Sequence, residues 1–351
     1  VPQRSDSDRA KVSFNPLGIP VEVVVIPVTI PGAKRRQGQR SEGIEVRANL
    51  ARAARYVVGS EQLGSYLGLP YEEVAFRVIR PFTGDSFTDV ELRGAIERAY
   101  ARIEHAAKAP LHQLAPGHHL LELFHGPTLA FKDFAMQLIA QLFEIALKRS
   151  GQRITIVGAT SGDTGSAAIE AFRGIDNVDV FIMFPHGRVS EVQRRQMTTP
   201  DAANVHALAL DGHFDDCQAR LKDLFNDHDF RDGVGLAGIN SINWARVVAQ
   251  IVYYVTAAAS LGMRDTDFCV PTGNFGDIFA GFAAKRMGLP IDRLIIATNA
   301  NDILDRTMKS GRYETSGVEA TMSPSMDIQV SSNFERLIFE AAGRDGDMVR
   351  R

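Results

Sequence analysis

The stretch "RITIVGATSGDTGSAAIEAF", Arg153 to Phe172, decides the fold. Its first part is rich in β-branched residues and predicts a strand, and its last part predicts a helix. A turn rich in Gly, Ser, Thr and Asp lies between the two. A strand, a loop and a helix in this order form the basic unit of a parallel sheet that is covered by helices.

The same alternation continues along the chain. Two helices are predicted first, over residues 72–82 and 88–103, the second with an apolar face; that face consists of Val90, Leu92, Ile96, Tyr100 and Ile103. Strands are then predicted at 120–124, 153–160, 178–185, 204–210, 267–273 and 293–299. Helices are predicted between and after them at 134–150, 165–172, 190–198, 214–227, 243–262 and 276–288.

This order predicts an α/β protein with two doubly wound, mostly parallel sheets flanked by helices. Residues 1–60 show no clear periodicity and receive no assignment. We expect a helical region over 61–115, a first α/β domain over 116–245 and a second over 246–351.

Composition excludes several classes of protein. The 351-residue chain has a net charge of −3, which argues against nucleic-acid binding. Cys217 and Cys269 lie far apart, and the nine histidines show no ligand spacing, so we expect no metal and a reducing, cytoplasmic location. We also expect no membrane association, because no apolar run is long enough to span a bilayer.

Two strand-to-helix junctions have sequences suited to anions. In "GATSGDTGSAA", Gly158 to Ala168, free backbone N–H groups at a helix start can bind a carboxylate or phosphate. In "VPTGNFGDIFAGF", Val270 to Phe282, four successive residues of a Gly-x-x-Gly loop can do the same. Neither junction is a Walker A loop or a dinucleotide fingerprint. The alternative for each is an ordinary tight turn, but two such loops in one fold favour ligand binding.

A single lysine stands out in "HGPTLAFKDFAMQ", His125 to Gln137. Lys132 lies where a helix begins, near Asp133, among small and apolar residues. Burial and the positive helix N-terminus are expected to lower the pKa of Lys132, so that its amine can form a Schiff base and move protons. Alone, a surface lysine is the stronger interpretation. Together with two anion-binding loops, Lys132 matches the needs of pyridoxal phosphate.

Other polar residues leave alternatives open. Asn243 and Arg246 lie three residues apart on one helical face and either face a ligand phosphate or cap and support the helix. The segment with Ser331, Ser332, Asn333 and Arg336 either lines a pocket or forms an ordinary connection into a helix.

Six motifs carry a resemblance to a known family: "LFHGPTLAFKD", "GATSGDTGSAA", "FPHGRVSEVQRRQMTT", "NSINWARVVAQ", "PTGNFGDIFAG" and "SPSMDIQVSSNFERL". From about Leu63 to its end, the chain resembles the threonine synthases in their longer bacterial and fungal form. The resemblance implies a fold-type II pyridoxal-phosphate enzyme, similar in fold to the tryptophan synthase β subunit. The implied activity is that of a carbon–oxygen lyase acting on phosphates, EC 4.2.3.1, which makes threonine from O-phosphohomoserine and water.

The resemblance also implies roles for individual residues. Lys132 is the expected Schiff-base lysine, which is displaced by the substrate amine and then moves protons at Cα and Cβ while phosphate leaves from Cγ. The cofactor is expected to contact Gly273, Asn274, Phe275, Gly276 and Asp163. The substrate is expected to contact Ser161, Gly162, Thr164, Gly165 and, less directly implied, Arg246. The sequence leaves the oligomeric state open and is compatible with a monomer.

The chain departs from the family pattern in two places. A "GGLYVP"-like stretch is not recognisable before about Leu63, and a "DPHTA"-like motif, whose Thr or Ser faces the pyridine nitrogen, does not occur. We therefore expect a truncated chain whose second α/β domain is incomplete. The alternatives are another fold-type II lyase such as a serine/threonine dehydratase, a non-catalytic ligand- or phosphopeptide-binding protein, and an inactive fragment.

Overall fold

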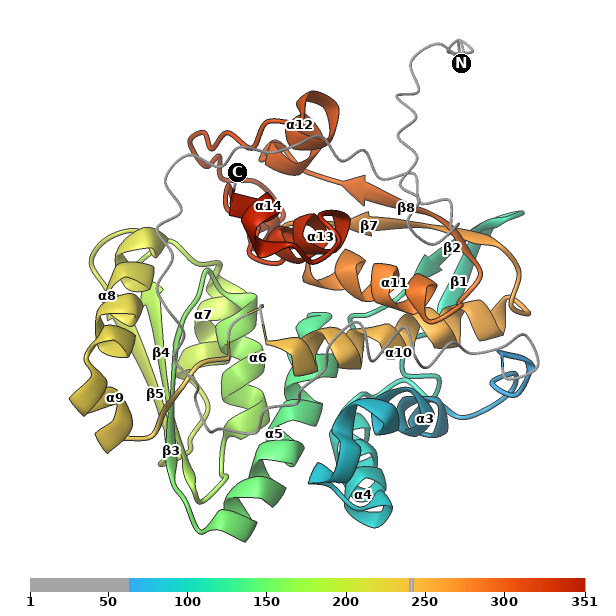
Figure 1. Cartoon of the computed structure of the whole chain (residues 1–351). Helices are drawn as coiled ribbons and strands as arrows, with labels where there is room; N and C mark the ends of the chain where they lie inside the picture. The colour runs from blue at the N-terminus through green and yellow to red at the C-terminus, as the bar shows by residue number, and fades with distance from the viewer. Residues whose placement is uncertain (1–62, 240, 242, 351) are drawn as a thin grey trace. The chain divides into compact units, whose positions relative to one another are not determined.

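The computed structural model describes residues 63–239, 241 and 243–350. These residues form two compact units. The first, called here the lysine unit, contains residues 63–264 and 283–290 of the described chain. The second, called here the glycine-loop unit, contains residues 265–282 and 291–350. Each unit contains parallel strands flanked by helices, which confirms the predicted α/β class (Figure 1).

The lysine unit is built on a four-stranded sheet in the order β5-β4-β3-β6. The strands are β3 (Ile154–Ala159), β4 (Val178–Pro185), β5 (Val205–Leu210) and β6 (Leu236–Ala237). All three pairings are parallel. The first three strands confirm the predictions to within one residue at each end, whereas the two-residue β6 is too short to leave a signal in the sequence.

Helices cover both faces of this sheet. The helices of the lysine unit are α3 (Tyr71–Thr83), α4 (Asp89–Tyr100), α5 (Lys132–Ser150), α6 (Asp163–Phe172), α7 (Glu191–Thr198), α8 (Phe214–Asn226), α9 (His228–Gly233) and α10 (Trp244–Ser260), with a 3₁₀ turn at Gly84–Ser86. In Figure 1, α5 and α6 lie on one side of the sheet and α8 lies on the other.

Successive side chains along each strand point to opposite faces of the sheet. Ile156 and Ile182 belong to the apolar core that includes Phe172 of α6 and residues of α5. Their neighbour Val157 points the other way and packs in a core with Cys217 of α8. Because both faces are covered, the strands read as nearly continuous apolar runs, which is why the sequence predicted them well.

A further layer of helices packs against α5. Both α10 and α4 contact α5, and α10 also contacts α3. Four aromatic rings join these helices, and their centroids are 4.9 to 6.2 Å apart; they belong to Tyr71, Tyr100, Phe134 and Tyr253. On α4, Val90 is 82% exposed, so its predicted place on the apolar face was wrong. It lies two residues from Leu92, which is about 200° around a helix.

Between α4 and α5 the structure differs from the prediction. Strand β1 (Leu111–Ala115) pairs antiparallel with β2 (His118–Leu121), with Gly117 in a left-handed conformation at the turn. The last five residues of the helical region expected over 61–115 therefore form a strand. The placing of a strand at 120–124 was wrong, because only its first two residues lie in β2. Both strands are mostly exposed, so no buried periodicity marks them in the sequence.

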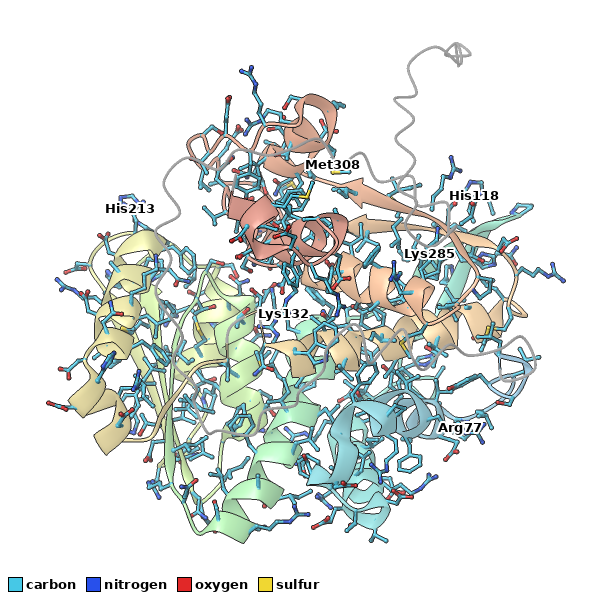
Figure 2. The ribbon with its side chains drawn as sticks, viewed as in Figure 1. Arg77, His118, Lys132, His213, Lys285 and Met308 are labelled. Carbon is cyan, nitrogen blue, oxygen red and sulfur yellow. The ribbon has the colours of Figure 1, made fainter. Side chains whose placement is uncertain are left out.

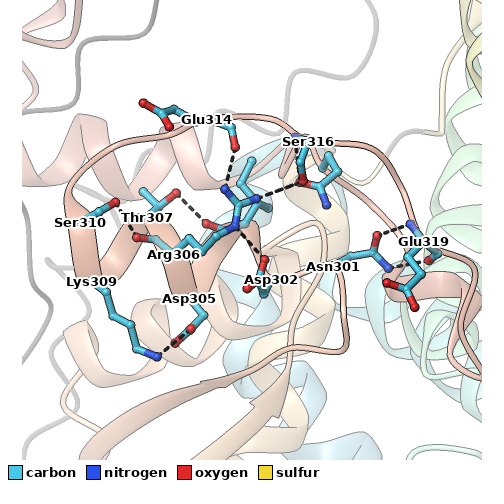
Figure 3. A network of polar contacts seen from close by, with 12 residues as sticks. Asn301, Asp302, Asp305, Arg306, Thr307, Lys309, Ser310, Glu314, Ser316 and Glu319 are labelled. Carbon is cyan, nitrogen blue, oxygen red and sulfur yellow. Dashed lines mark hydrogen bonds and ion pairs between the residues drawn. The ribbon is translucent and has the colours of Figure 1, made fainter.

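The glycine-loop unit contains the parallel pair β7 (Thr266–Pro271) and β8 (Ile291–Ala297). Its helices are α12 (Ile303–Ser310), α13 (Phe334–Ala341), α14 (Gly346–Arg350) and the first part of α11 (Gly276–Arg286), with a 3₁₀ turn at Pro324–Met326. The guanidinium of Arg306 on α12 contacts the Asp302 carboxylate at 2.7 Å and also the Glu314 carbonyl, the Ser316 hydroxyl and the Gln329 amide oxygen (Figure 3). These contacts hold an otherwise irregular segment against the helix.

The units differ from the domains expected from the sequence. Helix α10 lies in the lysine unit, whereas we placed a boundary between residues 245 and 246. The apolar face of α10 packs on α3 and α5, which accounts for its place there. The domain boundary itself stays a prediction, because a division into compact units does not show what folds by itself. No helix in the described part of the chain is long and apolar enough to cross a membrane.

The side chain of Asn204 gives a test of this fold. Its Nδ2 contacts the carbonyl oxygens of Phe172, Ile175 and Val178 at 2.8 to 3.3 Å, and its Oδ1 accepts from Gly174 N–H. We expect Asn204→Ala to lower the free energy of unfolding by about 2 kcal/mol, because it removes the side-chain hydrogen bonds to four backbone groups. Urea unfolding measures this. The exposed Gln152→Ala is the control, and equal midpoints for the two variants would contradict the role of Asn204.

Candidate active site

Lys132 is the first residue of α5, and its side chain is buried, with 7% of the residue exposed (Figure 2). Its Nζ lies 3.1 Å from Oδ2 of Asp163, the first residue of α6. The interpretation of Lys132 as a surface lysine is therefore wrong. Its prediction as a residue at the start of a helix, among apolar neighbours, is confirmed.

Two influences act on the charge of the Lys132 amine. Burial and the nearby start of α5 disfavour the ammonium form, as the sequence predicted. The Asp163 carboxylate at 3.1 Å favours it. The sequence placed these two residues in separate motifs and gave no sign that they pair, because 31 positions separate them. The structure thus joins the lysine and the acidic residue of the "SGDTG" loop into one site.

Hydrogen bonds between its own residues and Asp133 stabilise the turn that precedes Lys132. Asp133 is fully buried and accepts hydrogen bonds from the N–H of Thr128 at 2.9 Å and from its hydroxyl at 2.7 Å. Burial raises the pKa of Asp133, while its hydrogen bonds from Thr128 oppose that rise. A Cβ on Gly126 would lie 2.4 Å from the same carboxylate, and Leu129 adopts a left-handed backbone with φ of 61°. Such a backbone outlier often occurs at a functional site.

The second oxygen of Asp163 is also occupied. Nε2 of Gln193 on α7 donates to Asp163 Oδ1 at 2.6 Å. The Gln193 amide lies so close to Gly162 that a Cβ at this position would be 2.2 Å from the amide carbon. Gly162 also has a φ of 141°. Glycine is therefore required at this position by close packing as well as by backbone conformation, which the sequence alone could not show.

The "SGDTG" loop is organised by Thr160, a residue that the sequence analysis did not single out. Its hydroxyl oxygen accepts from the N–H groups of Gly162 at 2.9 Å and of Gly165 at 3.0 Å. Within the described part of the chain, the N–H groups of Ser161 and Thr164 have no acceptor. These two amide groups at the start of α6 are suited to bind a carboxylate.

The glycine-loop unit contains the second predicted loop, Gly273 to Gly276. The Ser331 hydroxyl donates to the Gly273 carbonyl at 2.7 Å, and Asn333 donates to the Asn274 carbonyl through both its N–H and its side chain. Among described groups, none accepts from the amide N–H groups of the four loop residues. Hydrogen bonds thus fix the carbonyl oxygens of Gly273 and Asn274, whereas the amide groups of the loop are left to bind an anion.

Two more features shape this loop. Phe275 is buried with a left-handed φ of 64°, and its ring packs edge-on against Phe334 with the ring centroids 5.2 Å apart. Arg336 donates to the side-chain oxygen of Asn333 at 3.0 Å. The Ser331–Arg336 segment therefore supports the loop through hydrogen bonds. The signal for this role was present in the run "SSN", whose short polar side chains can reach nearby carbonyls.

Arg246 lies in the first turn of α10 and is buried, with 4% of the residue exposed. Its guanidinium donates to the Ile239 carbonyl at 3.1 Å, and no carboxylate pairs with it among the residues described. Burial lowers the pKa of Arg246 to about 10. Asn243 caps the same helix by accepting from Ala245 N–H at 2.9 Å, which confirms its alternative role as a helix cap.

The chemistry that these residues offer is that of an amine and two sets of anion-binding amides. The described residues contain no group of three or more His, Cys, Asp or Glu side chains that could hold a metal ion. The lysine unit provides the amine with its carboxylate partner and one set of amides. The glycine-loop unit provides the other set.

Comparison with known proteins agrees with this chemistry. Residues 107–350 match the family described as pyridoxal-phosphate dependent enzyme, and residues 57–100 match the family described as threonine synthase N terminus. A solved, pyridoxal-phosphate-bound threonine synthase from Brucella melitensis is 55% identical, with a TM-score of 0.81 over 86% of this chain and 69% of that chain. The chain belongs to the threonine synthase family.

Curated threonine synthases show the same relation over part of their length. The protein from Pseudomonas aeruginosa is 57% identical over 82% of this chain and 62% of its own length. The protein from Saccharomyces cerevisiae is 47% identical over 78% of this chain and 57% of its own length. The chain thus spans about three-fifths of these relatives. The match to the threonine synthase N terminus begins at residue 57, slightly before the position near Leu63 that the motifs indicated.

The contact between Gly162 and Gln193 can be tested by Gly162→Ala. The new methyl group would collide with the Gln193 amide, and the backbone would keep an unfavourable φ. The matched control is Gly174→Ala, where φ is 76° and no atom lies within 4 Å of the added Cβ. We expect Gly162→Ala to be less stable than the control by about 2 kcal/mol in urea unfolding. Equal losses would mean that Gln193 does not pack against Gly162.

Proposed function

We propose that this chain carries the lysine and phosphate-binding parts of a threonine synthase. The reaction converts O-phospho-L-homoserine and water to L-threonine and phosphate with pyridoxal 5′-phosphate as cofactor. One observation carries the proposal: the Lys132 amine is buried and lies 3.1 Å from the Asp163 carboxylate, an arrangement suited to a Schiff-base lysine. Membership of the threonine synthase family supports the same conclusion.

The residues present fit a phosphorylated cofactor. The four amide groups from Gly273 to Gly276 lie at the start of α11, where the helix dipole favours an anion. A side chain on Gly273 would fill this region, because its Cβ would already lie 3.2 Å from Met326 Sδ and 3.3 Å from Ile328 Cδ1. These four residues would hold the cofactor phosphate, and Lys132 would bond to the aldehyde carbon.

The cofactor, when bound, supplies an electron sink for the carbanion chemistry. The chain itself supplies binding and proton transfer. The N–H groups of Ser161 and Thr164 would bind the substrate carboxylate, on a loop that Gly162 and Gly165 allow to approach closely. Lys132 Nζ would take and return protons at the substrate Cα and Cβ, with Asp163 balancing its charge.

Arg246 is our proposed contact for the substrate phosphate. A buried guanidinium that pairs with a neutral carbonyl and no described carboxylate is costly to the fold, because a buried charge is disfavoured without a counter-ion. A bound phosphate dianion would supply the counter-ion that this guanidinium lacks among the described carboxylates.

The alternatives have less support. A serine/threonine dehydratase would use the same lysine and loops, but the threonine synthases named above are 47 to 57% identical to this chain. A binding protein without catalysis would have no need of a buried lysine paired to a carboxylate. Cytoplasmic location and a monomeric state stay predictions.

The role of Lys132 is tested by trapping the cofactor on the protein. We expect borohydride reduction in the presence of pyridoxal phosphate to leave a stable adduct on Lys132, located by peptide mass spectrometry. Lys132→Ala should lose the adduct and the visible absorbance that accompanies it. The exposed Lys148→Ala is the control and should keep both. An adduct on other lysines but not on Lys132, in a folded chain, would contradict the assignment.

A comparison of products separates the two lyases. Equal amounts of phosphate and threonine from O-phosphohomoserine support a threonine synthase. Keto-acid from serine or threonine, without phosphate release from O-phosphohomoserine, supports the dehydratase.

The role of Arg246 predicts opposite effects on stability and binding. Arg246→Met keeps the length of the side chain but removes a buried charge, so the free energy of unfolding should stay the same or rise. Binding of inorganic phosphate, measured by calorimetry as a competitor of substrate, should weaken by about tenfold, which corresponds to one lost charge-assisted contact. A destabilised variant with unchanged phosphate affinity would show that Arg246 is structural.

A further inference from the structure

Helix α7 carries two glutamines that contact groups next to Lys132. Gln193 and Gln196 lie three residues apart and so share one face of the helix. Gln193 Nε2 donates to Asp163 at 2.6 Å, and Gln196 Nε2 donates to the carbonyl of Thr128 at 3.0 Å. One short helix therefore contacts both the carboxylate partner of Lys132 and the turn that precedes it.

The orientation of the Gln193 amide is determined by its other contact. Its Oε1 accepts from the N–H of Ser190 at 3.2 Å, and the Ser190 hydroxyl accepts from Gln193 N–H at 3.2 Å. This capping box begins α7. With the oxygen directed to Ser190, the NH₂ group must face Asp163. Gln193 is buried, with 8% exposed, so water competes little for this contact.

The contacts form a chain that ends at the amine. Gln193 donates to Asp163 Oδ1, and Lys132 donates to Asp163 Oδ2. The Asp163 side chain is 22% exposed, so loss of the Gln193 contact would open its Oδ1 atom to water. A hydrogen bond to one oxygen thus fixes the direction of the other, and the charge on the lysine depends on that direction.

We propose that Gln193 is a positioning residue for Lys132, which acts by holding the Asp163 carboxylate against the amine. Gln196 fixes α7 to the 126–129 turn, so that the helix keeps its place relative to both partners. The inference rests on the proposed function of Lys132, because it explains how the charge of that amine is set. It adds a role for the "SEVQRRQ" segment, which the functional assignment had left without one.

The test measures the amine itself, without cofactor. An amine-reactive acylating reagent labels Lys132 only in its neutral form, and mass spectrometry of the peptide gives the labelling rate at each pH. Gln193→Met removes the donor at similar size, so the carboxylate should loosen and the midpoint pH of labelling should fall. We expect a shift of about half a pH unit, or roughly threefold in rate at a fixed pH below the midpoint.

Gln193→Glu gives the opposite expectation. Glutamate still completes the capping box, so α7 should be preserved. It also places a second carboxylate beside Asp163, which should raise the labelling midpoint by about one pH unit, or about tenfold in rate. Arg194→Ala is the control on the same helix, since Arg194 pairs with Glu191 at the surface. This control should leave the midpoint unchanged.

The direction of each shift decides the outcome. A lower midpoint for Gln193→Met with a higher one for Gln193→Glu supports positioning. An unchanged or higher midpoint for Gln193→Met would overturn it, because Gln193 would then merely compete with Lys132 for the carboxylate. If Gln193→Met does not fold, Gln193→Ala, which also removes the donor, takes its place, and an unchanged or higher midpoint overturns the proposal. Because no cofactor is present, these results are independent of the borohydride test of the proposed function.

Discussion

The ion pair between Lys132 and Asp163 is the interaction on which the lysine unit depends. Two charges taken out of water are costly unless they pair closely and their remaining hydrogen-bonding capacity is used. Here the second carboxylate oxygen is used by Gln193, and the backbone on either side is fixed by Asp133 and Thr160. The polar groups of the site therefore support one another, and a change in any of them should affect the ion pair of the Lys132 amine.

The two predicted anion-binding loops are built in the same way. In each, a strand of a parallel sheet ends, and the chain turns into a helix. Near each helix start lie amide groups that have no acceptor among the described residues: those of Ser161 and Thr164 in one loop, and those of Gly273 to Gly276 in the other. Side chains hold the remaining groups in place: the Thr160 hydroxyl accepts from loop amides, and Ser331 and Asn333 donate to loop carbonyls. Backbone strain accompanies both sites, at Leu129 and at Phe275. Such strain is maintained only where surrounding contacts determine the conformation.

Much of this could be predicted from the sequence, for identifiable reasons. The buried strands β3 and β4 and the helix that begins at Lys132 carry strong apolar patterns, and the two glycine-rich loops mark helix starts. The exposed β1 and the two-residue β6 carry no such pattern. The contacts of Asp163 with Lys132 and with Gln193 arise only when segments 31 and 30 positions apart are folded together. Local periodicity contains no information about such contacts, so Thr160 and Gln193 received no role in advance.

If the proposed function is right, Lys132 bonds to the aldehyde carbon of pyridoxal phosphate and the amides of Gly273 to Gly276 bind its phosphate. A crystal structure of the chain grown with pyridoxal phosphate tests it most directly. The account predicts continuous density from Lys132 Nζ to the cofactor and a phosphate group within hydrogen-bonding distance of the loop amides, with Asp163 still near the lysine. A cofactor bonded to Lys132 whose phosphate lies away from this loop, or a cofactor bound without Lys132, would contradict the account.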